Sequence, residues 1–286
     1  MRFGSAESSE SGRLRLILCN PVSVSDVIFA GVSLKGSIFS IINQNNMKRL
    51  LILSLFGVII FSSCREVFGK RIRGNGAVKT ESRSVGQFNS VHVSGSIDVY
   101  VRQDSITSVK VEADENLLEY VIVENDGGTL EIHQKQGINL KPSRSIKVYV
   151  SGNAFRHFKA SGACDIFGEN KITSDEKISI DLSGASDIKM ELKAPGVDAE
   201  LSGAGTITLR GETKDFTVDG SGSTDIKCYE LLAENVNVKL SGAGDAQVFA
   251  SVKLDVKVSG AADIKYKGNP VISQQVSGAG GVKKAE

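Results

Sequence analysis

The chain has 286 residues with 34 basic and 33 acidic side chains, so its formal net charge of +1 gives no field that favours nucleic acid. Glycine is abundant at 30 residues, proline is scarce at 4, tryptophan is absent and aromatic residues make up 6%. This composition is typical of many short strands joined by tight turns. It fits poorly with a sugar-binding cleft or a platform for single-stranded nucleic acid, because both depend on aromatic stacking.

The segment MKRLLILSLFGVIIFSSC, from Met47 to Cys64, has the pattern of a secretory signal. Two basic residues precede an apolar run of about twelve residues, which is too short to span a bilayer comfortably. Small residues then precede Cys64. The pattern predicts a lipoprotein signal peptide, with Cys64 as the lipidated residue that anchors the protein to the membrane. A buried apolar helix with an incidental cysteine is the alternative.

Residues 1–46 precede a better start at Met47 and show no strong continuous pattern, so we interpret them as an over-long gene model. The expected organisation is a signal peptide at 47–63, a linker at 64–75 and one domain at 76–286, which divides into a strand-rich part (76–150) and a Ser-Gly repeat part (151–286).

A Ser-Gly pair recurs along the chain, with its serine at Ser94, Ser161, Ser183, Ser202, Ser221, Ser241, Ser259 and Ser277. From Ser161 onward the spacings are 22, 19, 19, 20, 18 and 18 residues. A period near twenty that persists over several copies is typical of a solenoid.

Apolar residues alternate with polar ones on both sides of each pair, as in Ile178, Ile180 and Leu182 around Asp181. This period of two predicts strands. The sequence therefore predicts an all-β fold, a β-helix-like solenoid of 18–22-residue repeats in which the Ser-Gly pair is a corner. Small corner residues let successive repeats nest, and glycine allows unusual backbone angles. The expected corner residues are Ser183, Gly184, Ser202, Gly203, Ser221, Gly222, Ser241, Gly242, Ser259 and Gly260.

The strand-rich part lacks the twenty-residue period but alternates at 90–103 and 145–150, and 121–134 predicts a hairpin that turns at Asp126-Gly127-Gly128. The segments between repeats vary most, and we expect them to be return turns that carry recognition. The last copy offers little closure, so that end is either frayed or covered by a partner. Exposed ends of a solenoid also favour edge-to-edge pairing into a homo-oligomer.

An aspartate follows most corners, at Asp98, Asp165, Asp187, Asp225, Asp245 and Asp263. We expect each carboxylate to accept hydrogen bonds from the backbone of its own turn, with weak calcium candidates at Asp245 and Asp263. The histidines His92, His133 and His157 form no metal-ligand spacing, and we expect no zinc and no cofactor. Cys228 falls on an inward position, and Cys164 lies three repeats earlier, roughly 14 Å away, so no disulfide between them is expected.

Catalysis has one candidate, the outward column Asp181, Glu200 and Asp219, which would suit a polysaccharide-active enzyme. Such a column is more typical of a solvated face, and no catalytic residue is predicted.

Several stretches resemble one known family: GNGAVKTESRSVGQFNSVHVSGSIDVYV, EADENLLEYV, GINL at 137–140, the SGAGD copies and KYKGNPVISQQVSGAG. They are similar to the head GIN domain family of auto-transporter adhesins. The resemblance implies a right-handed single-stranded β-helix and a lipoprotein of the Gram-negative cell envelope. It implies no activity and supplies no catalytic residues.

We therefore expect a lipid-anchored outer-membrane protein that acts by binding a protein or glycan partner rather than by catalysis. Whether it faces the surface or the periplasm stays open. A periplasm-facing structural or stress-related role is the alternative.

Overall fold

A computed structural model describes residues 69–286, which belong to one compact unit, Arg65–Glu286. The expected over-long start, the signal peptide and the lipidation of Cys64 lie outside the described residues. The predicted all-β class is confirmed. No helix among the described residues is long and apolar enough to cross a membrane.

In chain order the elements are β1 (Lys70–Arg73), β2 (Val78–Arg83), β3 (Ser90–Gly95), β4 (Ile97–Gln103), β5 (Ser108–Asp114), the 3-10 helix η2 (Glu115–Tyr120), β6 (Val121–Asp126), β7 (Thr129–Gln134), β8 (Ile138–Lys141), β9 (Ile146–Gly152), β10 (His157–Gly162), β11 (Asp165–Thr173), β12 (Ile178–Gly184), β13 (Asp187–Lys267), β14 (Val271–Gly278) and β15 (Gly281–Lys284).

The first strands pair in both directions. β2, β5 and β9 are antiparallel neighbours, and β6 and β7 form an antiparallel hairpin at the predicted turn. Gly127 and Gly128 have φ of 57° and 88°, the positive values that a two-residue hairpin of this kind requires. β3 pairs parallel with β7, and β4 pairs parallel with β9. The switch to parallel pairing at these strands starts the stacked part of the sheet.

The segment 64–75, interpreted above as a linker, contains a strand. β1 pairs parallel with β8 over Lys70 to Arg73, and Ile72 packs against the core. Because Ile72 lies between basic residues, the sequence shows no alternation of apolar and polar residues here that would predict a strand.

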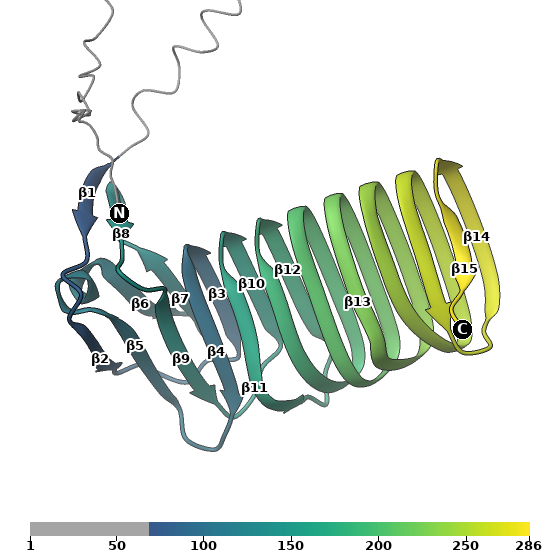
Figure 1. The fold of residues 1–286 in the computed structure, drawn as a ribbon. Coiled ribbons are helices and arrows are strands. Elements are labelled where there is room, and N and C mark those ends of the chain that lie inside the picture. Colours follow the sequence, from purple (N-terminus) through teal and green to yellow (C-terminus); the bar gives the residue numbers. More distant parts are fainter. Residues whose placement is uncertain (1–68) are drawn as a thin grey trace, which may run out of the picture. The chain divides into compact units, whose positions relative to one another are not determined.

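The chain then winds in successive turns that stack side by side (Figure 1). β3, β10, β12 and the start of β13 align their Ser-Gly pairs, so that Gly95, Gly162, Gly184 and Gly203 are consecutive partners. The corners leave no room for a side chain: a Cβ on Gly203, whose φ is +114°, would lie 2.4 Å from the carbonyl oxygen of Gly184. At the last turn, Gly260 is the partner of Gly278.

The apolar positions identified from the alternation form the core. Ile178, Ile180, Val197 and Ile207 are each completely buried, and the equivalent residues of later turns are nearly so. Three inward residues near the end of the chain are exceptions: Tyr266 is only partly buried against the core, and Ile272 and Val276 of the last turn are exposed. At the first turns the core also contains Phe155 and Phe158, whose rings stack with centroids 5.6 Å apart.

The segments between repeats differ from the predicted return turns. β13 continues through them without interruption over 81 residues, so they are extended. Each also buries small side chains, including Ala194, Thr213, Ala233 and Ala250. They therefore form a further side of each turn. Leu232 and Val252 remain half exposed on them.

Candidate binding groove

An aromatic ladder runs across three neighbouring strands on the outer surface. Tyr149 of β9 is in register with Tyr100 of β4, which is in register with Phe167 of β11. The rings of Tyr100 and Tyr149 stack with centroids 5.2 Å apart, and the rings of Tyr100 and Phe167 stack at the same distance. Parallel in-register pairing thus gathers three partly exposed aromatic rings in one place.

A β-bulge opens a groove next to this ladder. The register of β11 against β13 shifts between Phe167 and Lys171, so Gly168 and Glu169 lie in the irregular segment. A Cβ on Gly168 would lie 2.8 Å from the Cβ of Met190, so only glycine fits here without movement. Bulges of this kind often adjoin functional sites because they break the regular surface of a sheet.

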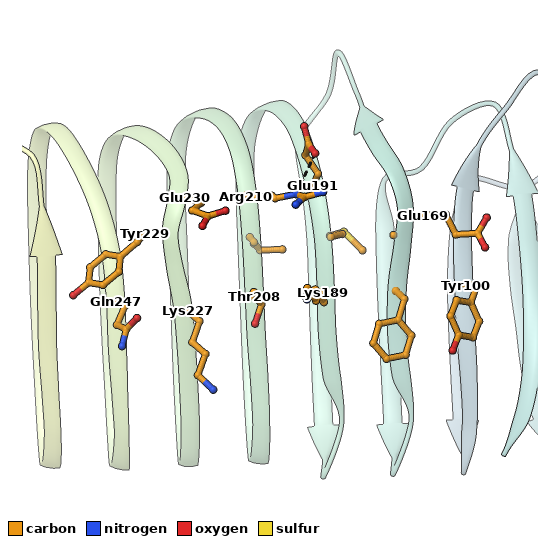
Figure 2. Close-up of a pocket in the computed structure, with 14 residues that line it drawn as sticks. Tyr100, Glu169, Lys189, Glu191, Thr208, Arg210, Lys227, Tyr229, Glu230 and Gln247 are labelled. Atoms are coloured by element: carbon orange, nitrogen blue, oxygen red, sulfur yellow. Dashed lines mark ion pairs between the residues drawn. The ribbon is translucent and has the colours of Figure 1, made fainter. Parts of the chain in front are cut away.

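The groove has a volume of about 860 Å³ and crosses six neighbouring strand segments, from β4 through β11 to four successive turns of β13. Figure 2 shows Tyr100 at one end, Tyr229 toward the other, and Lys189, Thr208 and Lys227 in a row between them. Its remaining lining residues are Phe167, Gly168, Glu169, Met190, Glu191, Leu209, Arg210, Glu230 and Gln247.

Charged side chains line one edge of the groove in pairs. The Nε atom of Arg210 lies 3.1 Å from Oε2 of Glu191, an ion pair that is visible in Figure 2. Lys171 lies 3.9 Å from the other oxygen of Glu191. Lys189 and Lys227 belong to the same row as Phe167 and are exposed. The groove thus offers donors and acceptors beside aromatic rings, with no net excess of one charge.

Two tyrosines of this face, Tyr149 and Tyr229, carry protonated hydroxyls at neutral pH. Burial raises the pKa of Tyr229. Burial, followed by the nearby carboxylate of Glu112, also raises the pKa of Tyr149. The hydroxyl of Tyr149 donates to Oε2 of Glu112 at 3.5 Å. Lys267 lies over the ring of Tyr229, 4.8 Å from its centroid. The hydroxyl of Tyr229 is therefore available as a hydrogen-bond donor, whereas that of Tyr149 is directed to Glu112.

The predicted aspartate column lies beside the aromatic row. Asp98, Asp165 and Asp187 occupy consecutive strands, and Asp187 accepts a hydrogen bond from the backbone N–H of Thr206 at 2.7 Å. This bond comes from the next turn rather than from the residue's own turn. Burial and then the charge of Asp165 raise the pKa of Asp98, while burial and then the charge of Asp187 raise the pKa of Asp165.

The calcium candidates Asp245 and Asp263 are exposed members of later turns. Among residues 69–286 no group of three or more metal-binding side chains comes together. The acidic column Asp181, Glu200 and Asp219 faces outward, between Lys159 and Lys239 in the same row. The structure brings neither set into a shared enclosed site.

Both cysteines of the described residues are free and buried. The inward position predicted for Cys228 is confirmed, whereas the burial of Cys164 was not predicted. Burial raises the pKa of Cys228 to about 12, and burial is also the main cause that raises the pKa of Cys164. Their thiols are therefore core side chains.

A hydrogen-bonded row of histidines was not anticipated from the sequence. Nδ1 of His92 lies 2.9 Å from Glu131, the rings of His92 and His157 meet at 3.4 Å, and Nε2 of His157 lies 2.8 Å from Asp181. The row is built by pairing between strands that are remote in sequence, so spacing alone gave no signal.

The fold and the groove define an all-β protein of stacked strand turns with a ligand-sized hollow on its outer face. The chain belongs to the family described as "Putative auto-transporter adhesin, head GIN domain", whose model matches residues 87–270. The predicted family is thereby confirmed. No curated protein matches the chain.

Solved structures of similar fold come from species of Bacteroides and Parabacteroides. A protein of Bacteroides fragilis described as a putative adhesin is 22% identical, with a TM-score of 0.70 over 75% of this chain and 100% of its own. A protein of Parabacteroides distasonis described as a putative lipid binding protein is 24% identical, with a TM-score of 0.63 over 76% of this chain and 100% of its own. A putative adhesin of the same organism is 25% identical, with a TM-score of 0.62 over the same shares. The family and these relatives are described by binding rather than by an enzymatic reaction.

Proposed function

We propose that this chain is a lipid-anchored binding protein of the cell envelope, adhesin-like and without catalytic activity, and that it binds an extended glycan in the groove described above. The observation that carries the proposal is the aromatic ladder at the bulge, where stacked rings adjoin a row of hydrogen-bonding side chains. The wider architecture belongs to the proposal: a right-handed β-helix solenoid, supported by corner pairs offset by 18 to 22 residues, such as Gly260 with Gly278 and Gly162 with Gly184.

The dimensions and chemistry of the groove favour a glycan. Neighbouring strands lie about 4.8 Å apart, which is close to the advance per sugar of an extended pyranose chain, so successive sugars would meet equivalent positions on successive strands. Aromatic rings pack against the apolar faces of sugars, while Lys189, Thr208 and Gln247 can bond their hydroxyls. The charged edge makes this open groove unsuited to an acyl chain, which requires an enclosed apolar cavity.

A glycan screen tests the proposal. Residues 65–286 would be applied to cellohexaose, mannohexaose and chitohexaose, with hexagalacturonate as a charged comparison. We expect saturable binding of at least one uncharged oligosaccharide, lost in Tyr100→Ala and kept in Lys239→Ala, which lies on another outward row. Absence of binding to all four, or binding that Tyr100→Ala leaves unchanged, would reject the groove as a glycan site.

The anchor and the location are tested separately. Radiolabelled palmitate should enter the full chain and not Cys64→Ala. Protease treatment of intact cells, with lysed cells as the control for cleavability, should remove the protein if it acts as a surface adhesin. Protection until lysis would instead favour a partner within the envelope.

A further inference from the structure

The two ends of the stacked turns differ in how they are closed. At the first end, η2 buries Leu117 and Leu118 and the hairpin of β6 and β7 covers the next turn. At the last end all eight residues of β14 are exposed, and β14 has a paired strand on one side only, where it meets β13. One end is therefore capped and the other is open within residues 69–286 (Figure 1).

The core reaches this open end. Ile272 is in register with Leu254, and Val276 is in register with Val258. Leu254 and Val258 point inward and are buried, so Ile272 and Val276 point inward as well. They are nevertheless 39% and 38% exposed, because no further turn lies over them.

β14 also lacks the charges that usually protect an edge strand. Its sequence is VISQQVSG, without a single ionisable side chain. The preceding turn carries Lys253, Asp255 and Lys257 at the equivalent outward positions. The edge strands of the capped end are charged too, since β2 reads VKTESR and β6 reads VIVEND. Exposed edge strands of native proteins normally carry such charges, which prevent pairing with another chain. The uncharged strand β14 therefore favours pairing with a further strand.

We propose that β14 pairs antiparallel with β14 of a second copy of this chain, about a two-fold axis at Gln274. In an antiparallel pair, residues directly opposite each other point to the same face of the sheet. Because side chains alternate between the faces and both strands are the same segment, two opposite residues are either both even-numbered or both odd-numbered, and their numbers add to an even sum. Centring the pair on Gln274 places Ile272 opposite Val276 twice and Gln274 opposite itself. A shift by one pair along the strand would instead place Gln274 opposite an apolar residue.

This arrangement completes the core of both copies. The two apolar pairs cover each other, and the inward amides of the two Gln274 side chains can bond to one another across the axis. β15, at the same end, carries Lys283 and Lys284, so β14 is the uncharged edge that sets the register. Because the other end is capped, the assembly closes as a two-fold dimer and does not grow into a fibre.

The occupant is a second copy because the edge is self-complementary: in the register centred on Gln274, both inward apolar residues, Ile272 and Val276, lie opposite an apolar residue. The test uses residues 65–286, since Arg65–Glu286 is one compact unit and solved relatives match about this share of the chain over their whole length. The full chain in detergent is tested beside it.

Sedimentation should give a dimer for residues 65–286, and Gln274→Cys should form a disulfide-linked dimer under mild oxidation. Two residues facing each other on an antiparallel pair have Cα atoms about 4.5–5.5 Å apart, within disulfide reach. Ser273→Cys is the matched control: two copies of Ser273 sit diagonally, beyond that reach, and should not link. Gln274→Lys, at a position that is exposed in the monomer, should give a folded monomer.

A wild-type monomer at 100 µM would overturn the proposal, and so would a dimer that survives Gln274→Lys or links through Ser273→Cys instead. If residues 65–286 dimerise while the full chain stays monomeric, the segment before Arg65 covers the open end and the proposal fails for the intact protein. These results do not depend on glycan binding, so the dimer and the glycan site are tested independently of each other.

Discussion

The rings of Tyr100 and Phe167 stack with their centroids 5.2 Å apart, although one belongs to β4 and the other to β11. Their contact depends on the register of two parallel strands, Tyr100 with Phe167 and Val99 with Ile166. The same register places the bulge of β11 next to the ladder. The groove is thus a consequence of how the first regular turns stack on the strand-rich part.

Gly203→Ala should destabilise the protein strongly. The added Cβ would meet the carbonyl oxygen of Gly184 at 2.4 Å, and the φ of +114° is unfavourable for any other residue. We expect a loss of more than about 2 kcal/mol in the free energy of unfolding, measured by urea denaturation. Ser202→Ala, at the exposed neighbouring position, is the control and should change stability by less than about 0.5 kcal/mol. Equal stability of the two variants would refute close nesting of the corners.

Asp114→Ala should remove a buried contact that holds the capped end together. Although burial alone would raise the pKa of Asp114, hydrogen bonds from Ser143 and from the N–H of Gly76, together with Arg144, hold that pKa below its ordinary value. Losing the carboxylate leaves these donors unpaired, at a cost of about 1–3 kcal/mol.

The contribution of Asp114 also depends on pH. Because the pKa is lowered in the folded state, the stabilisation is present above the unfolded value of about 3.9 and is lost as pH falls through the folded pKa. Urea midpoints of wild type and Asp114→Ala should therefore differ at pH 7 and converge toward about pH 2. A constant difference would show that the carboxylate charge is not involved.

Asp165→Asn should stabilise the protein at neutral pH. Burial and then the charge of Asp187 raise the pKa of Asp165, so the folded state binds the proton more tightly than the unfolded state. Stability from this group is present in acid and decreases as pH rises from about 3.9 through the raised folded value. The gain at pH 7 should be less than about 1 kcal/mol, since the site is partly solvated. Asp175→Asn, on an exposed loop, should have no effect; a loss of stability in Asp165→Asn would contradict the account.

The thiols of residues 65–286 should be unreactive in the folded protein. Cys164 and Cys228 are fully buried, and burial raises the pKa of Cys228 to about 12. A thiol reagent such as DTNB at pH 8 should titrate neither cysteine in the native protein and both after unfolding in urea. Fast reaction of one thiol in the native state would show that the core opens locally.

Much of the stacked part could be predicted because each repeat carries its own information. The alternation around Ser183 and Ser202 identifies inward and outward positions without reference to any other strand, and Ile178, Val197 and Ile207 are buried accordingly. Glycines at the corners have a local physical cause, namely the close approach of the next corner. The hairpin at Gly127 and Gly128 was likewise a local signal.

The groove could not be predicted in this way. Composition argued against a sugar site, because 6% aromatic residues is an average over the chain, whereas stacking depends on where a few rings lie. Tyr100, Tyr149 and Phe167 come together only through strand pairing. The bulge at Gly168 adds residues that no repeat position anticipates. The contact of His92 with His157 could not be predicted from the sequence for the same reason, because it depends on the pairing of two strands that are remote in sequence.

The most direct test of the central claim is an isothermal titration of residues 65–286 with the best uncharged hexasaccharide from the screen, repeated for Tyr100→Ala, Phe167→Ala and Lys239→Ala. We expect Tyr100→Ala and Phe167→Ala each to weaken binding about tenfold or more, corresponding to about 1.4 kcal/mol, and Lys239→Ala to match wild type. Unchanged affinity in both aromatic variants, with their fold intact by circular dichroism, would contradict a glycan site at the aromatic ladder.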